Sequence, residues 1–146
     1  MRIVRQVAIE RSSGQVSEFF MDVHNLARWD RSVEKVEVLT PQLQGVGFRF
    51  DTVGPSTHGR PGRRMHYIVS ALNPQRFIEA VLIEYPMFRG ASWRMEFEPH
   101  PAGTLLTCVA IFHLRHKYAF LMPILWLSGR AITRDLGYLK SRIEGD

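Results

Sequence analysis

The last stretch of the chain, Tyr118–Asp146 (YAFLMPILWLSGRAITRDLGYLKSRIEGD), decides how the remaining residues can fold. Its apolar side chains recur three or four residues apart, which is the spacing of one buried face on an α-helix. Arg130 and Arg134 fall on the opposite face, which we expect to be exposed to water. The pattern predicts one continuous amphipathic helix. Its buried face would contain Leu121, Ile124, Leu125, Ser128, Ile132, Leu136, Leu139 and Ile143.

The N-terminal residues predict a strand followed by two short helices. Residues 3–9 alternate between apolar and polar side chains, which is typical of a half-buried strand. Ser12 and Gln15 have the spacing of a capping box, so we expect a helix over about Ser13–Asp22. Asn25 is placed to cap a second short helix that contains Leu26 and Trp29.

The middle of the chain reads as successive strands joined by short turns. Such connections favour hairpins, and therefore an antiparallel meander. The loop Gly54–Gly62 is rich in glycine and proline, and we expect it to be a mobile gate, with the loop around Pro86–Gly90 as the alternative entrance. The predicted fold is α+β: a curved antiparallel sheet of about seven strands around the C-terminal helix, in a single domain spanning residues 1–146. The expected strands after residue 9 are 33–40, 48–53, 64–72, 77–84, 92–98 and 104–114.

Composition excludes several classes of protein. The net charge is +5, but the arginines are scattered and no nucleic-acid-binding motif accompanies them. No segment is long and apolar enough to span a membrane, and Cys108 is the only cysteine. We therefore expect a soluble cytoplasmic protein without a specific nucleic-acid partner. Weak contact with a membrane surface stays open because of the basic charge.

Three stretches resemble one known superfamily. They are VAIERSSGQVSEFFMDVHNLARWDRSVEKVEVL (7–39), SWRMEFEPHPAGTLLTC (92–108) and LGYLKSRIEG (136–145). In this order they are similar to the START and Bet v 1-like (SRPBCC) superfamily, in its polyketide cyclase/dehydrase and lipid-transport branch. The resemblance implies a helix-grip fold with a hydrophobic cavity between sheet and helix. Members carry lipids, sterols, quinones or polyketides, and some cyclise polyketides. Their catalytic residues share no motif, so the resemblance assigns none here.

Large apolar side chains at inward positions form the candidate ligand-binding wall. Apolar cavities with a few polar groups are the usual sites for small molecules. Tyr67 and Ser128 would supply the polar groups. The complete predicted set is Trp29, Phe48, Phe50, Tyr67, Val69, Trp93, Met95, Phe97, Phe112, Leu125, Ser128 and Ile132.

Catalytic groups are weakly indicated. The histidines lack the spacing of metal ligands, and no cofactor motif is present, so we expect neither a metal nor a cofactor. Cys108 is expected to be a buried apolar side chain. Glu79 would be a general acid if it pointed inward, but the phase that places Ile78, Ala80 and Leu82 inside is favoured. His24 and His66 are the other titratable candidates.

The expected function is therefore binding or transport of a hydrophobic small molecule, with an affinity that varies little with pH. An aromatase/cyclase-type enzyme is the alternative. A protein-interaction module is the third interpretation, since Leu105, Val109 and Ile111 would make the outer face of the last strand apolar. This face leaves a homodimer contact open.

Overall fold

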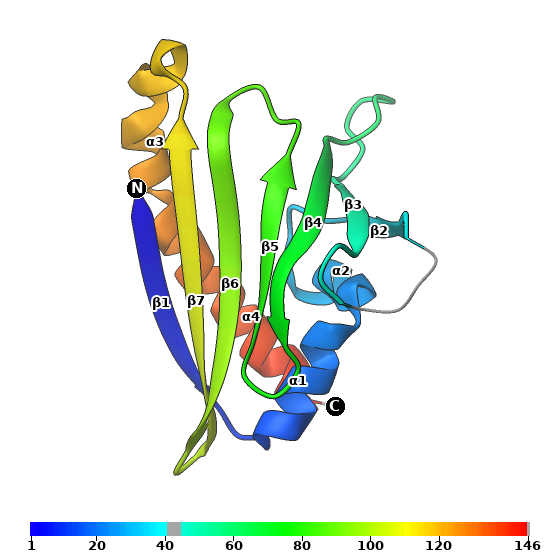
Figure 1. Ribbon diagram of the computed structural model, residues 1–146, viewed down its shortest axis with the longest axis vertical. Coiled ribbons are helices and arrows are strands. Elements are labelled where there is room, and N and C mark those ends of the chain that lie inside the picture. Colours follow the sequence, from blue (N-terminus) through cyan, green and yellow to red (C-terminus); the bar gives the residue numbers. More distant parts are fainter. Residues whose placement is uncertain (41–44, 146) are drawn as a thin grey trace.

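The computed structural model describes residues 1–40 and 45–145 (Figure 1). Residue 146, at the end of the predicted helix, lies outside the described residues. The elements are β1 (Arg2–Ile9), α1 (Ser13–Met21), η1 (Val23–Asn25), α2 (Leu26–Trp29), β2 (Lys35–Val38), β3 (Arg49–Val53), β4 (Arg64–Asn73), β5 (Phe77–Ile83), β6 (Phe88–His100), β7 (Gly103–Leu114), η2 (His116–Leu121), α3 (Met122–Trp126) and α4 (Ser128–Gly145), where η marks a 3₁₀ helix.

The strands form one antiparallel sheet of seven in the order β1-β7-β6-β5-β4-β3-β2. From β2 to β7 this order is a meander, and β1 pairs with β7 from Arg2 opposite Ile111 to Ile9 opposite Thr104. In Figure 1, α4 crosses behind the sheet, and the short helices lie on the same side. The predicted helix-grip fold is therefore confirmed.

The connection after β1 follows the predicted capping chemistry in its first helix only. Ser12 accepts a hydrogen bond from the Gln15 backbone, and the Gln15 side chain accepts from the Ser12 backbone. The prediction that Asn25 caps α2 is wrong. Asn25 closes the 3₁₀ turn η1 with helical φ and ψ, whereas a capping residue needs extended backbone. Its side chain instead donates to the Phe19 carbonyl at 2.8 Å.

The C-terminal helix is not continuous, which corrects the prediction. Pro123 has no N–H to donate, so helical bonding restarts at α3. At the end of α3 the Leu127 N–H donates to the Ile124 carbonyl, in the tighter 3₁₀ pattern. The 3.6-residue period does not continue through such turns. Ile124, predicted to be buried, is consequently 62% exposed.

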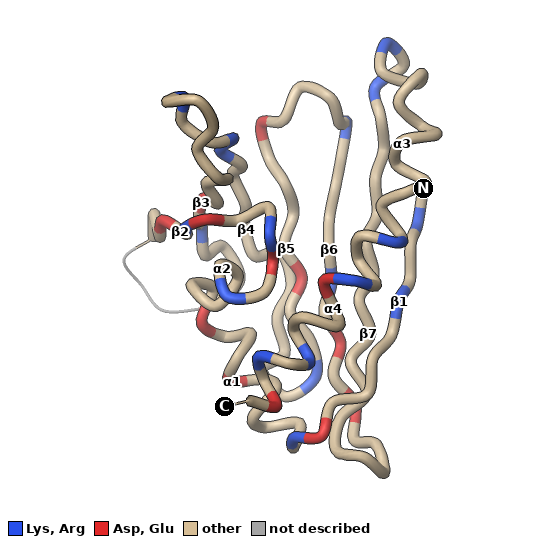
Figure 2. The backbone as a smooth tube through the Cα atoms, turned by 180° about the vertical axis from the view of Figure 1, so that it is seen from behind, with Lys and Arg blue, Asp and Glu red and all other residues tan. Residues whose placement is uncertain are grey.

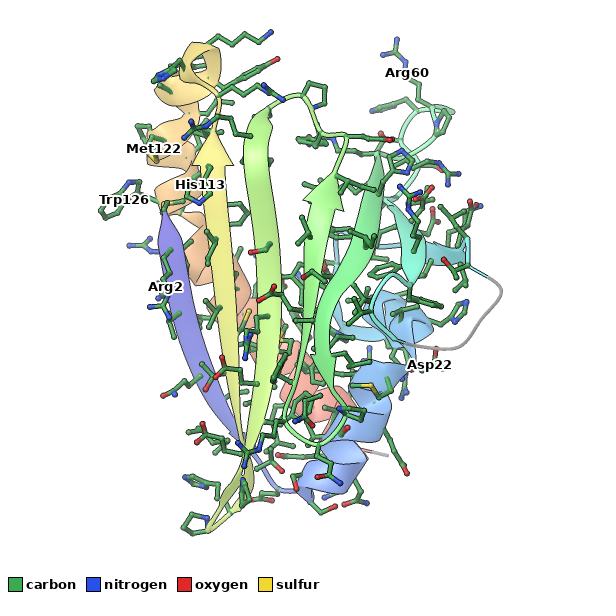
Figure 3. The ribbon with its side chains drawn as sticks, viewed as in Figure 1. Arg2, Asp22, Arg60, His113, Met122 and Trp126 are labelled. Atoms are coloured by element: carbon green, nitrogen blue, oxygen red, sulfur yellow. The ribbon has the colours of Figure 1, made fainter. Side chains whose placement is uncertain are left out.

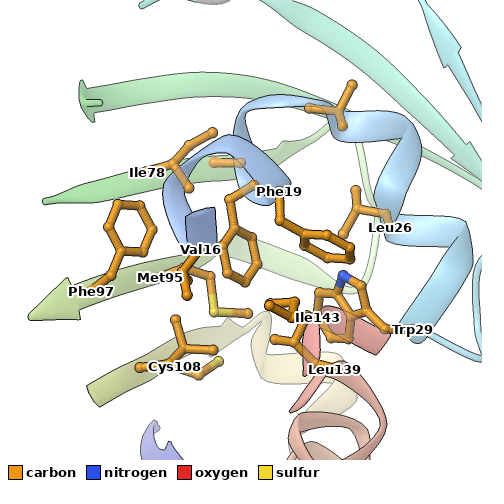
Figure 4. Close-up of a cluster of buried hydrophobic side chains, with 14 of the residues drawn as sticks. Val16, Phe19, Leu26, Trp29, Ile78, Met95, Phe97, Cys108, Leu139 and Ile143 are labelled. Carbon is orange, nitrogen blue, oxygen red and sulfur yellow. The ribbon is translucent and has the colours of Figure 1, made fainter. Parts of the chain in front are cut away.

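Along α4 the predicted face is observed. Leu136, Leu139 and Ile143 are buried, while Arg130 and Arg134 are exposed. The buried α4 side chains meet aromatic residues from α1 and α2, as Figure 4 shows. Among these aromatics, Phe20 stacks on Phe97 of β6 with ring centroids 5.8 Å apart. This core closes one end of the space between the sheet and α4.

The outer face of the sheet carries polar pairs. The Glu79 carboxylate accepts from Ser70 Oγ at 2.9 Å and lies 3.5 Å from Arg94 Nη1. Ile78 and Ala80 are buried, so the favoured phase for β5 is confirmed. On β7 the residues Leu105 and Ile111 are half-buried and Val109 is buried. These three apolar side chains are therefore at most partly exposed, and a contact through this face stays a prediction. Within residues 1–40 and 45–145, no helix is both long enough and apolar enough to cross a bilayer.

Candidate ligand pocket

An apolar pocket of about 210 Å³ lies between the sheet and α4. Three structural groups surround it: α2 with the residue after it, the strands β4 to β7, and residues 132–136 of α4. Its lining consists of Leu26, Trp29, Asp30, Tyr67, Leu82, Ala91, Ser92, Trp93, Met95, Cys108, Ala110, Phe112, Ile132, Asp135 and Leu136.

The register of β6 against β7 explains why space remains here. Trp93 is opposite Ala110, and Ala91 is opposite Phe112. Each of these two large side chains therefore has a small neighbour across the strands. Side chains at opposite positions of an antiparallel pair share one face, so the small residues leave room that the large ones border. The pocket follows from this alternation of size.

The structure separates the predicted wall into residues that line the pocket and residues that do not. Six of the predicted side chains line the pocket: Trp29, Tyr67, Trp93, Met95, Phe112 and Ile132. Phe48, Phe50, Val69 and Phe97 are instead packed in the core, and Phe50 is completely buried. Leu125 and Ser128 are half-buried and do not border the pocket. Ligand contact by any of these residues stays a prediction.

Tyr67 supplies one polar group to the pocket. Its ring stacks on Phe50 at 5.3 Å between centroids and meets Trp93 edge-on at 6.4 Å. Burial, with the negative charge of Asp30 nearby, raises the pKa of the Tyr67 hydroxyl, so this group remains protonated. The hydroxyl's described partner is the Met65 sulfur at 3.6 Å, which is a weak acceptor. The hydroxyl can therefore exchange this contact for one with a ligand.

Asp135 is a pocket residue that the sequence analysis missed. Its position three residues after Ile132 places it on the inward face of α4, and this helical spacing was the available signal. Its Oδ1 is buried without a hydrogen-bond partner among the described residues, and Arg134 Nε is 3.8 Å away. Burial and the negative charge of Asp30 both raise the pKa of the Asp135 carboxyl. Asp30 also borders the pocket, but its Oδ1 accepts from Ser32 N and Oγ.

The other titratable candidates lie away from this pocket. His24 is exposed beside Asp22, and His66 Nδ1 lies 2.7 Å from the buried Asp51 on the outer face of the sheet. Cys108 borders the pocket, but burial raises the pKa of its thiol to about 12. A thiol that stays protonated at neutral pH is a poor nucleophile.

The loops expected to gate the cavity do not border it either. No residue of Gly54–Gly62 or 86–90 is among the lining residues. The backbone of Gly62 lies so close to Gly54 that a Cβ on Gly62 would be 1.8 Å from the Gly54 carbonyl oxygen. The Gly54 N–H also donates to the Arg63 carbonyl at 2.8 Å. The base of this loop is therefore closed by its own contacts.

A sheet wrapped around a C-terminal helix, with an apolar pocket between them, defines the helix-grip class of proteins. This chain belongs to the family described as polyketide cyclase/dehydrase and lipid transport, which it matches over residues 1–144. The resemblance inferred from the sequence is thereby confirmed. No curated protein sequence matches the chain.

Several solved structures share the fold. Ara h 8.0201 superposes with a TM-score of 0.78 at 8% identity, covering 100% of this chain and 99% of that one. TTHA0849 from Thermus thermophilus has a TM-score of 0.75 at 16% identity, covering 98% and 97%. The di-domain ARO/CYC StfQ from the steffimycin biosynthetic pathway has a TM-score of 0.73 at 13% identity, covering 98% of this chain and 48% of that chain. At such identities the likeness shows the fold alone.

Proposed function

We propose that this protein binds a hydrophobic small molecule, of the lipid, quinone, sterol or polyketide-like kind, in the pocket between the sheet and α4. The observation that carries the proposal is an apolar cavity with a carboxylate oxygen at its border that has no hydrogen-bond partner among the described residues. Apolar contact supplies the driving force, at about 25 cal/mol per Å² of buried area. Asp135 would accept a hydrogen bond from one donor group of the ligand.

The size of the cavity limits the ligand. At about 210 Å³ it is smaller than most small-molecule pockets, which span roughly 300–1,000 Å³. A compact ring system would fit within the pocket, whereas a longer molecule would insert one end only. A buried acceptor without a hydrogen bond favours a hydroxyl or amine on the inserted part, because that group can donate to Asp135. Because Asp135 titrates, affinity for such a ligand would depend on pH, unlike the pH-independent binding expected from the sequence.

Titration with a neutral solvatochromic dye tests the pocket. Ala110→Phe fills the space opposite Trp93 and should abolish dye binding, whereas Ala102→Phe, in the exposed β6–β7 turn, is the matched control and should bind normally. If Ala110→Phe does not fold, Ile132→Ala enlarges the pocket and should change dye affinity or emission. Unchanged binding in Ala110→Phe and Ile132→Ala would refute this site. If dye binding is lost as expected, native mass spectrometry of protein purified from its own host would identify the natural ligand.

Asp135 also favours a second candidate, an aromatase/cyclase-type enzyme. A carboxyl with a raised pKa beside an apolar cavity is a suitable general acid. Protonated Asp135 would donate to a ketone oxygen of a bound polyketide and thereby promote ring closure. Asp135→Asn keeps the shape and the acceptor but cannot transfer a proton. Turnover of a poly-β-ketone substrate that disappears in this variant, with affinity retained, would support the enzyme over the carrier.

A further inference from the structure

Half of the exposed large apolar side chains among the described residues lie between the end of η2 and the start of α4. Four large side chains lie within eight residues of each other: Phe120 is 71% exposed, Ile124 62%, Trp126 72% and Leu127 59%. Figure 3 shows Trp126 projecting from α3 away from the sheet. We call these four residues the α3 patch. An isolated exposed apolar residue needs no explanation, but a contiguous group of this size usually marks an interaction site.

Basic residues surround the α3 patch. The sequence contains no Asp or Glu between Glu98 and Asp135, whereas Arg115, Lys117 and Arg130 lie in this interval. Strand β1, which lies next to α4, carries Arg2 and Arg5 and contains no acidic residue. In Figure 2 the end of the molecule formed by η2, α3 and the first half of β1 is blue or tan throughout. Glu84 is an acidic residue outside these elements, in the connection between β5 and β6.

These cations are available to an external partner. Among the described residues, Arg2, Arg115, Lys117 and Arg130 have no carboxylate within ion-pair distance. Lys117 lies over the ring of Tyr118, with Nζ 5.3 Å from the ring centroid. Exposed aromatic and aliphatic side chains with lysine and arginine beside them are typical of protein surfaces that insert into the membrane interface.

We propose that the α3 patch docks this protein on an anionic phospholipid surface. Phe120, Ile124, Trp126 and Leu127 would enter the boundary between headgroups and acyl chains. Arg2, Arg115, Lys117 and Arg130 would contact the lipid phosphates. A second copy of the chain is a poorer occupant, because a symmetric contact places the same four unpaired cations of each copy opposite one another, and like charges repel.

The docking would be peripheral and reversible. α3 has five residues and α4 begins a new, polar helix, so the patch can enter the interface but cannot span the bilayer. Attraction between exposed basic residues and anionic lipid is screened by salt, which predicts weaker binding as ionic strength rises. This proposal does not depend on the pocket, since none of the four patch residues borders it.

Vesicle co-sedimentation tests the proposal. Vesicles of phosphatidylcholine are compared with vesicles that also contain phosphatidylglycerol, at low and high salt. We expect the wild-type protein to bind the anionic vesicles and to be released by salt. The double substitution Phe120→Ser/Trp126→Ser should weaken binding about tenfold or more, because the inserted apolar area is lost. Arg115→Gln/Lys117→Gln should weaken it about five- to thirtyfold.

Matched variants separate this surface from general effects of polarity or charge. Leu39→Ser/Val46→Ser removes two exposed apolar side chains elsewhere, and Arg60→Gln/Arg63→Gln removes two exposed cations on the distant loop. Both controls, and the pocket-filling Ala110→Phe, should bind vesicles like the wild type. Circular dichroism should show that the patch variants remain folded, since they alter exposed positions.

Several outcomes would overturn the proposal. One is the absence of wild-type binding to anionic vesicles at low salt. Another is equal binding to both vesicle types, or equal loss in the patch and control variants. Light scattering tests self-association as the other explanation. If the wild-type protein is a dimer that does not bind vesicles, and Phe120→Ser/Trp126→Ser converts it to a monomer, the α3 patch would be assigned to self-association instead.

Discussion

Replacing Asp135 by asparagine should stabilise this protein at neutral pH. The carboxylate oxygen Oδ1 is buried without a hydrogen-bond partner among the described residues, and burial and Asp30 both disfavour its charge. An unsatisfied buried polar atom costs about 1–3 kcal/mol, and more when it is charged. Asparagine keeps the acceptor and removes only the charge, so it recovers only part of this cost. The side chain of Asp135 remains 20% exposed, and Arg134 is near, so the lower end applies. We expect a gain of about 1 kcal/mol, or about 2–4 °C in melting temperature for a domain of this size.

The gain should depend on pH with a defined sign. The pKa of Asp135 is higher in the folded protein than its ordinary value of 3.8, so between these two values the folded state binds more protons than the unfolded state. The unfolding free energy of the wild type therefore falls as pH rises through that window. Asparagine resembles the protonated acid, so the two proteins should be equally stable below pH 3.8 and diverge above it.

Urea unfolding at a series of pH values measures this difference. Glu18→Gln is the matched control, because Glu18 is an exposed carboxylate on α1, and its stability profile should follow that of the wild type. The reasoning would be refuted if Asp135→Asn were less stable than the wild type at neutral pH. A stability difference of the same size at acidic and neutral pH would refute it equally.

Three further predictions concern the core, the outer face and the loop base. Phe50→Ala should lower the unfolding free energy in urea by about 3–5 kcal/mol, because this side chain is fully buried. Trp93→Ala should lower it less but should reduce dye binding more, because Trp93 borders the pocket. Equal losses of dye binding in the two variants would contradict the division between core and pocket. The Arg64 guanidinium and Lys35 lower the pKa of Glu37 from 4.5 to about 2. The contribution of the charged Glu37 to the unfolding free energy is therefore fully present above pH 4.5 and is lost as pH falls through about 2. Arg64→Met should make this acid loss smaller, and an unchanged profile would show that the pair is not coupled to folding. Gly62→Ala should destabilise the protein by about 1–3 kcal/mol, because its Cβ clashes with the Gly54 carbonyl. The control Gly45→Ala has open space around it and should leave stability nearly unchanged. Equal melting temperatures of the two variants would show that the loop base rearranges freely.

The positions of the polar pocket groups show why function was harder to predict than fold. Tyr67 was predicted from alternation along β4 and does border the pocket. Asp135 follows the same helical spacing as Ile132, but the neighbouring sequence does not indicate whether a charged residue near the edge of an apolar face is buried. Only the approach of α2 to α4 excludes water from its oxygen and places Asp30 nearby. Both effects come from residues about a hundred positions away in sequence.

Local pattern by itself determined the strands, the capping of α1, the inward face of α4 and the family. These features depend on hydrogen bonding and side-chain periodicity between residues close in sequence, which the chain carries directly. Tertiary structure decided the rest. Whether a large apolar residue fills the core, as Phe50 does, or borders the pocket, as Trp93 opposite Ala110 does, depends on what packs around it from elements distant in sequence. The exposure of the α3 patch was decided in the same way. Helical bonding restarts at Pro123 and tightens to a 3₁₀ turn at Leu127, and the apolar side chains of this segment are left exposed.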